Sequence, residues 1–165
     1  MSANTLFNDS TVVLGIETSC DETAAAVVMG GNDVLSSVVA TQIDLHARYG
    51  GVVPEIASRA HVEAMNVVIR QAVSQSGVPI ERIDAVAATV GPGLIGALLV
   101  GVAAAKSVAL VLDKPFIGVN HLEAHLYAAL LDDPHVEFPM LVVLVSGGNT
   151  LFVEMRGHGD FSVIG

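Results

Sequence analysis

The order of apolar segments along the chain constrains its fold more than any other feature. Three short segments rich in β-branched residues come first, at 11–18, 24–30 and 33–41, with only brief polar turns between them. Such closely spaced segments predict an antiparallel meander. Beyond residue 53, segments with helical spacing alternate with continuous apolar runs, a pattern typical of helices and buried parallel strands. The sequence therefore predicts a mixed α/β sheet.

Helices and strands alternate after the opening strands, and the last segments repeat the opening pattern. We expect a long amphipathic helix at 54–77, a buried strand at 83–90, a helix at 94–112, a strand at 115–119 and a helix from about 120 to 131. After a polar connection at 132–139, we expect a hairpin formed by 140–148 and 149–157 and the start of a third strand. The order β-β-β-α-β-α-β-α followed by β-β-β predicts the actin–hexokinase–Hsp70-like (RNase H-like) fold, in which nucleotide lies between two lobes.

The expected domains follow from this order. Residues 1–10 are expected to be disordered, 11–135 to form a complete first lobe, and 139–165 to form the first strands of a second lobe that is only begun. An unfinished sheet leaves an unpaired edge, so we expect the chain to be a fragment with apolar strand surface exposed at 140–165.

Composition narrows the classes of function. The single cysteine, Cys20, excludes an intramolecular disulfide and fits the cytoplasm. The net charge of −10 excludes binding to nucleic acid by net attraction, so a local patch or a partner would supply positive charge. Residues 85–105 carry no charged side chain and are long enough to span a bilayer, but Gly91-Pro92-Gly93 interrupts them. We expect a core helix here and no contact with a membrane.

Polar residues are concentrated in the expected turn between the first two strands. They are Glu17, Thr18, Ser19, Asp21, Glu22 and Thr23. Hydroxyl and backbone N–H groups in such a turn can meet a phosphate, and a carboxylate can hold a metal ion or water. A polar hairpin turn without function is the alternative, although two polar residues would suffice for that.

Two glycine-containing segments are ambiguous on their own. Residues 89–101 place glycines between a buried strand and a helix, where N–H groups could face an anion, yet they match neither a Walker A loop nor GxGxxG. Close packing of strand and helix explains them equally well. Residues 144–150 end a strand in Ser-Gly-Gly, which suits either close approach to a ligand or a simple hairpin turn.

His121 and His125 are four residues apart in an expected helix, so they project from one face and could bind one metal ion. The metalloprotease motif HExxH is excluded, because Glu123 lies two residues after the first histidine and should face away from the ion. Two ligands leave such a site incomplete. We expect both imidazoles to face an open cleft near Ser146–Gly148.

Five segments taken together resemble the TsaD family, the universal tRNA N6-adenosine threonylcarbamoyltransferases, in order and spacing. They are VLGIETSCDETAAAVV, GGVVPEIASRAHVE, GPGLIGALLVGVAAAK, NHLEAH and LVSGGNT. The resemblance implies an actin-like enzyme that moves a threonylcarbamoyl group from threonylcarbamoyl-adenylate to N6 of the adenosine beside the anticodon of tRNA, with release of AMP. It also implies two protein partners, an inactive paralogue subunit and an ATPase subunit.

The resemblance assigns roles residue by residue. His121 and His125 match the family's metal-binding helix and would ligate one divalent ion, iron(II) ahead of zinc, while the family's third ligand, a late aspartate, has no counterpart. The substrate-contacting loop matches Leu144, Val145, Ser146, Gly147 and Gly148, and the phosphate-side loop matches Ser19, Asp21 and Glu22. Asn149 replaces a usual histidine, and no catalytic base is identified.

Two other functions are alternatives to this one. A non-catalytic actin-like scaffold paralogue of the same tRNA-modification complex shares the first-lobe fold but lacks the metal-binding helix. The older description of the family as a sialoglycoprotease has no nucleophile and base to support it here.

We also expect partner contact through a stripe on the helix at 54–77, formed by Met65, Val68, Ile69 and Ala72, with core packing as the alternative. The 165-residue chain alone is expected to be inactive.

Overall fold

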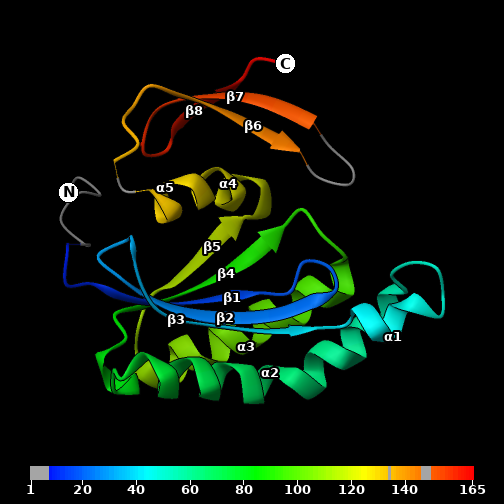
Figure 1. Cartoon of the computed structure of the whole chain (residues 1–165). Helices are drawn as coiled ribbons and strands as arrows, with labels where there is room; N and C mark the ends of the chain where they lie inside the picture. Colours follow the sequence, from blue (N-terminus) through cyan, green and yellow to red (C-terminus); the bar gives the residue numbers. More distant parts are fainter. Residues whose placement is uncertain (1–7, 134, 146–149) are drawn as a thin grey trace. The chain divides into compact units, whose positions relative to one another are not determined.

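The computed structural model describes residues 8–133, 135–145 and 150–165. They form two compact units, the first ending at His121 and the second beginning at Leu122 (Figure 1).

The first unit is built on a five-stranded mixed sheet with the strand order β3-β2-β1-β4-β5. Strands β1 (Val12–Glu17), β2 (Glu22–Met29) and β3 (Asp33–Thr41) form the expected antiparallel meander. Strand β4 (Ala85–Gly91) pairs in parallel with β1, and β5 (Phe116–Asn120) pairs in parallel with β4. Helices in the β3–β4 and β4–β5 connections allow these parallel pairings. The predicted mixed sheet is confirmed.

The helices of this unit are α1 (Ile43–Ala47), α2 (Pro54–Ser76), a short 3₁₀ helix at Ile80–Arg82, and α3 (Ile95–Leu112). Figure 1 shows α2 and α3 side by side against the sheet. Core side chains come from the alternating inward positions of β1, β2 and β4 and from one stripe of each long helix. Among them Leu14, Val27 and Val86 are almost fully buried. The apolar faces that the sequence pattern shows are thus paired with one another.

The apolar stripe of α2 lies inside this core. Met65, Val68, Ile69 and Ala72 are all buried within the first unit, where α2 packs against β2 and β3. The expected partner contact through this stripe is therefore wrong, because an amphipathic helix on a sheet turns its apolar face toward the sheet. The solvent-facing side of α2 carries polar residues such as Glu63, Asn66 and Arg70.

Helix α3 is apolar except for Lys106 and Ser107, and it buries its small residues. Ala97, Gly101, Ala105 and Ala109 are buried as α3 packs against β4 and α2. Among the described residues, α3 is the one helix that is long and apolar enough to cross a membrane by length and composition alone, a test that core helices also pass. It begins beyond the interruption at Gly91-Pro92-Gly93.

Gly101 of α3 lies directly against Thr18. A Cβ atom at position 101 would stand 2.3 Å from Thr18 Oγ1, a hydroxyl that is buried and donates a hydrogen bond to the Ala97 carbonyl. We expect Gly101→Ala to lower the free energy of unfolding by about 1–3 kcal/mol, because the extra methyl group overpacks this contact. In Gly51→Ala the new Cβ meets nothing within 4 Å. That control should stay within about 0.5 kcal/mol in urea denaturation, and equal stabilities of the two variants would contradict the packing.

The second unit contains helices α4 (His121–Leu126, whose first residue closes the first unit) and α5 (Ala128–Asp132) and an antiparallel sheet in the order β6-β7-β8. The strands are β6 (Met140–Val145), β7 (Thr150–Gly157) and β8 (Asp160–Val163). Leu126, Val153 and Met155 form its buried core. The single helix expected from 120 to 131 is divided at Tyr127, whose hydroxyl accepts a hydrogen bond of 3.0 Å from the Gly159 N–H.

Strand β6 is apolar on both faces. Leu141, Val143 and Val145 are exposed, whereas Leu144 on the opposite face is buried. Phe152, Val163 and Ile164 are exposed as well. The expected apolar strand surface at 140–165 is therefore present in this unit.

Candidate functional site

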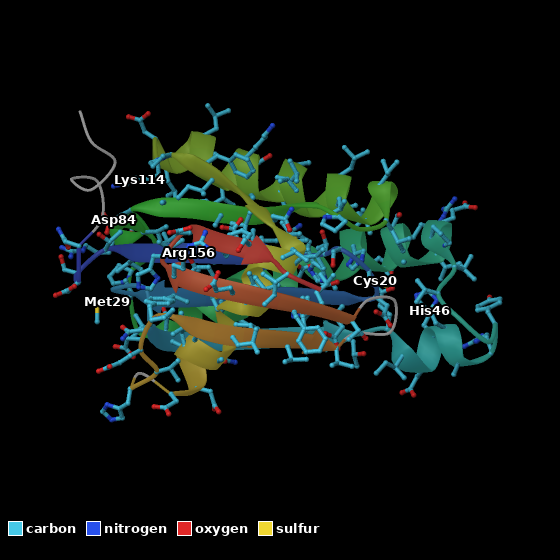
Figure 2. The ribbon with its side chains drawn as sticks, turned by 90° about the horizontal axis from the view of Figure 1, so that it is seen from above. Cys20, Met29, His46, Asp84, Lys114 and Arg156 are labelled. Carbon is cyan, nitrogen blue, oxygen red and sulfur yellow. The ribbon has the colours of Figure 1, made fainter. Side chains whose placement is uncertain are left out.

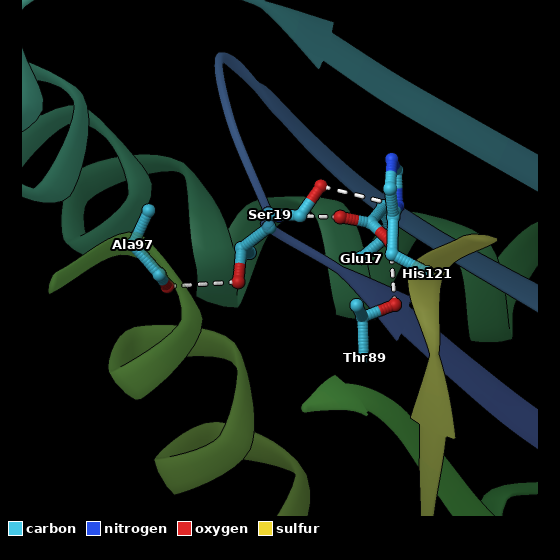
Figure 3. A network of polar contacts seen from close by, with 6 residues as sticks. Glu17, Ser19, Thr89, Ala97 and His121 are labelled. Carbon is cyan, nitrogen blue, oxygen red and sulfur yellow. Dashed lines mark hydrogen bonds and ion pairs between the residues drawn. The ribbon is translucent and has the colours of Figure 1, made fainter. Parts of the chain in front are cut away.

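The turn between β1 and β2 is joined to the N-terminus of α3 (Figure 3). The Thr18 hydroxyl donates to the Ala97 carbonyl over 2.9 Å, and the Leu94 N–H donates to the Ser19 carbonyl over 2.8 Å. Both Thr18 and Ser19 are buried. Two segments that the sequence singled out separately, 17–23 and 89–101, thus form one structure.

Gly93 explains how closely these two segments meet. A Cβ atom at this position would lie 2.6 Å from the Ser19 carbonyl oxygen and 2.8 Å from the Ser19 Cβ. Any side chain at position 93 would push the β1–β2 turn away from α3. Close packing therefore accounts for the glycines at 93 and 101, and the presentation of N–H groups to an anion stays a prediction.

Glu17, the last residue of β1, connects the turn to His121. Its carboxylate accepts hydrogen bonds from the Ser19 N–H and the Thr89 hydroxyl. His121 Nδ1 lies 3.3 Å from Glu17 Oε2 and 3.2 Å from Ser19 Oγ (Figure 3). Burial acts to raise the pKa of Glu17, but the hydrogen bonds from Ser19 and Thr89 and the nearby His121 outweigh it, and the pKa is lowered. The site therefore holds an ionised carboxylate against the histidine at neutral pH.

The predicted phosphate-side residues occupy different positions in this turn. Ser19 belongs to the network around Glu17. Asp21 uses its backbone carbonyl to accept the Gln42 N–H over 3.0 Å, and Glu22 begins β2 with its side chain exposed. Cys20 lies between Ser19 and Asp21 in the chain. Partial burial and then Asp21 raise the pKa of its thiol, so the thiol stays neutral. A cysteine nucleophile gains no support from this environment.

Helix α4 carries both histidines of the predicted metal site. His121 begins the helix half-buried and His125 follows four residues later, exposed. A histidine whose Nδ1 is held by a carboxylate binds a metal through Nε2, so the contact between His121 and Glu17 fits a ligand role. Among the described residues, no group of three or more His, Cys, Asp and Glu side chains could hold one ion. The metal site, including the outward direction of Glu123, stays a prediction.

The predicted substrate loop is described only in part. Leu144 and Val145 end β6, the first buried and the second exposed. Ser146, Gly147, Gly148 and Asn149 lie outside the described residues, as do residues 1–7 of the expected disordered segment. The expected cleft shared by this loop and the two histidines therefore also stays a prediction.

A second polar network, which sequence reasoning missed, lies beneath the β1–β2 turn. His61 of α2 is fully buried, and its Nε2 lies 3.1 Å from the Cys20 carbonyl oxygen. Its Nδ1 lies 2.8 Å from Thr23 Oγ1 and 3.3 Å from Gln42 Nε2. Gln42 Oε1 in turn contacts His46 Nε2 at 3.0 Å. Figure 2 shows Cys20 and His46 at the same end of the molecule.

The hydrogen-bond pattern assigns one protonation state to His61. A carbonyl can only accept, so Nε2 carries the proton, and Nδ1 accepts from the Thr23 hydroxyl and the Gln42 amide. The imidazole is therefore neutral. Burial lowers the pKa of His61, an effect that the Cys20 carbonyl and the charges of Glu17 and Asp21 only partly oppose and that His46 reinforces.

We expect the stability of the protein to fall as pH is lowered through the region of the histidine pKa. The pKa of folded His61 lies below its ordinary value of 6.5, so below pH 6.5 the unfolded chain binds a proton that the folded chain does not. Stability from this group is complete above pH 6.5 and is lost as pH falls through the folded pKa. Urea denaturation between about pH 7.5 and 5.5 measures the slope.

The variant His61→Gln should flatten this slope, whereas His135→Gln, at an exposed position, should keep it. The two variants remove the same titratable group from different environments. If both change the slope equally, burial of His61 is not its cause.

Comparison with known proteins places these features in a family. A family model described as TsaD, tRNA N6-adenosine threonylcarbamoyltransferase, matches residues 33–165. The chain is 59% identical over 154 residues to a protein of that name from Symbiobacterium thermophilum, covering 93% of this chain and 45% of that protein. It is 58% identical to the protein of the same name from Geobacillus kaustophilus, covering 96% of this chain and 46% of that protein. The chain thus spans about half the length of these relatives.

Among solved structures, the chain is similar to YeaZ from Pseudomonas aeruginosa. The TM-score is 0.59 at 17% identity, covering 94% of this chain and 65% of YeaZ. At this identity the likeness concerns the fold alone, and it agrees with the actin-like class predicted from the element order.

Proposed function

Because the chain belongs to the tRNA N6-adenosine threonylcarbamoyltransferase family, we propose that it forms the first lobe and part of the active site of an enzyme that transfers a threonylcarbamoyl group from threonylcarbamoyl-adenylate to N6 of the adenosine beside the anticodon in tRNA. One observation carries this assignment to the site. The β1–β2 turn, the N-terminus of α3 and His121 are linked through Ser19 and Glu17. A scaffold without chemistry would not need a partly buried carboxylate that fixes a histidine.

Each part of this arrangement has a role in the proposed transfer. Ser19, with Asp21 and Glu22 beside it, borders the phosphate of the adenylate. His121 and His125 hold a divalent ion, iron(II) ahead of zinc, and Glu17 keeps the His121 ring in orientation through Nδ1. Leu144, Val145, Ser146, Gly147 and Gly148 border the threonylcarbamoyl group. When bound, the ion supplies Lewis acidity toward the activated carbonyl.

The chain's own residues contribute mainly orientation. The attacking N6 is a weak nucleophile, so holding it in line with the carbonyl accounts for a large part of the rate. Glu17 is already engaged with Ser19, Thr89 and His121, which suits a positioning role. We assign no residue as the general base.

The test uses the chain joined to the part of the Symbiobacterium thermophilum relative that it does not match, hereafter the extended chain. It is incubated with its partners, tRNA and freshly made threonylcarbamoyl-adenylate. Mass spectrometry of the tRNA nucleosides should show threonylcarbamoyladenosine, with one AMP released for each modified base. A tRNA with guanosine beside the anticodon is the control. Absence of product, when the relative itself modifies the same tRNA, would contradict the proposal.

The acidic chain needs help to bind tRNA in this proposal. With a net charge of −10, the long-range field of residues 1–165 repels the phosphate backbone. We place the positive charge on the remainder of the enzyme or on its two partners, an inactive paralogue subunit and an ATPase subunit. The proposed complex acts in the cytoplasm. Weaker tRNA binding by the extended chain alone than by the complex, in a filter-binding titration, is the expected observation.

The outer surface of α3 is the best candidate for contact with the paralogue subunit. Ile95, Leu99 and Leu110 lie on this helix and are 78%, 63% and 82% exposed. Replacing Leu99 with aspartate should weaken binding of the paralogue at least about tenfold in a calorimetric titration, because it places a charge in an apolar interface. The matched control is Ser107→Asp, an exposed position on the same helix. Equal affinities of the two variants would place the partner elsewhere.

A further inference from the structure

Three successive carbonyl groups of the β1–β2 turn are held by three different elements. The Ser19 carbonyl accepts the Leu94 N–H at the start of α3. The Cys20 carbonyl accepts His61 Nε2–H from α2, and the Asp21 carbonyl accepts the Gln42 N–H at the start of α1. The turn is therefore anchored at three successive peptide groups.

This anchoring determines what the turn presents on its other side. In a trans peptide group the N–H points opposite to the carbonyl that precedes it. Each of the N–H groups of Cys20, Asp21 and Glu22 therefore points away from the element that holds the carbonyl before it. Backbone N–H groups held in a fixed direction can meet an anion.

His61 is the only one of the three anchors that comes from a side chain. Its distance to the Cys20 carbonyl is 3.1 Å, and Thr23 Oγ1 and Gln42 Nε2 hold the other ring nitrogen. Both sides of the ring are thus fixed, and the ring is fully buried. Cys20 adjoins Ser19, which contacts His121. One short series of contacts thus runs from His61 through Cys20 and Ser19 to His121.

We infer that His61 is a positioning residue for the phosphate-side turn, which it holds by donating a hydrogen bond from neutral Nε2 to the Cys20 carbonyl so that the turn's N–H groups face the phosphate of a nucleotide. This role rests on the proposed function and extends it to a residue that does not touch substrate. It also explains why a histidine is buried beneath a loop whose exposed side is polar.

The test compares three variants of the extended chain. His61→Ala removes the donor, and His61→Gln offers an amide N–H in its place. Ser36→Ala is the matched control, because Ser36 Oγ makes a buried hydrogen bond of 2.7 Å to the Ala72 carbonyl, which anchors the same helix α2 away from the turn. Thermal unfolding establishes that each variant is folded at the assay temperature.

Two measurements separate positioning from general stability. The first is the amide NMR signals of Cys20, Asp21 and Glu22, with and without AMP. The second is the KM for threonylcarbamoyl-adenylate beside the KM for tRNA. In His61→Ala we expect these signals to broaden and the KM for adenylate to rise about threefold to tenfold, as the loss of one hydrogen bond predicts, with the KM for tRNA unchanged. His61→Gln should restore both, and Ser36→Ala should alter neither.

Each outcome decides the inference. Unchanged turn signals in folded His61→Ala, or equal effects in Ser36→Ala, would overturn it. If the unmodified extended chain transfers nothing but His61→Ala still releases the turn, positioning by His61 stands and the proposed transfer fails.

Discussion

Replacing either His121 or His125 with alanine in the extended chain should lower the transfer rate by more than about 100-fold, since loss of an outer-shell partner of a metal ligand alone costs about 10–100-fold. Both residues lie on α4, and His121 is already oriented by Glu17 at 3.3 Å. With one imidazole gone, the ion loses half of the ligands that this chain provides. Metal analysis of the purified variants should show loss of the ion in parallel with loss of activity.

Two companion variants make this prediction specific. Glu123→Ala changes the same helix between the two histidines, at a position expected to face away from the ion, and should leave metal content and rate near those of the unchanged protein. Glu17→Gln keeps the shape of the side chain but weakens the hold on Nδ1, and should reduce activity about 10–100-fold. Full activity of His121→Ala or His125→Ala with metal still bound would exclude the histidine pair as ligands.

Much of the fold follows from local sequence patterns. The strand β3 was expected and found at residues 33–41, and the long helix was found one residue shorter than expected. In both, apolar residues and a proline or glycine at or shortly beyond an end mark the element locally. Helix α1 was missed because it is only five residues long and has no side-chain cap. The division at Tyr127 was missed because no glycine or proline marks it.

The networks around the site could be predicted only in part. The sequence places Glu17 and Ser19 in one turn and His121 on a helix, but 104 residues separate Glu17 from His121, and only the strand order brings them together. His61 stood within a motif that carried the family resemblance, yet nothing local shows that it reaches Cys20, 41 residues away. The signal available in the sequence was a histidine on the apolar face of a predicted helix. Its role depends on which carbonyl group lies next to it in the folded protein.

The 165-residue chain without further sequence should not catalyse the transfer. Its described residues offer no group of three candidate metal ligands, whereas three protein ligands would hold an ion and leave room for substrate. The resemblance implies a fold in which nucleotide lies between two lobes, and this chain spans about half the length of its relatives. An adenylate bound to it would therefore be held from one side only and would be open to water.

The assay compares the chain with the extended chain under identical conditions, with partners, tRNA and fresh adenylate. We expect only the extended chain to produce threonylcarbamoyladenosine. We expect the shorter chain to bind AMP at least about tenfold more weakly, because the contacts of one lobe are missing. We also expect the shorter chain to associate in size-exclusion chromatography through the exposed apolar residues of β6, Leu141, Val143 and Val145. Turnover by the 165 residues near the rate of the extended chain would show that two histidines and one lobe suffice, and would overturn both the ligand count and the two-lobe requirement.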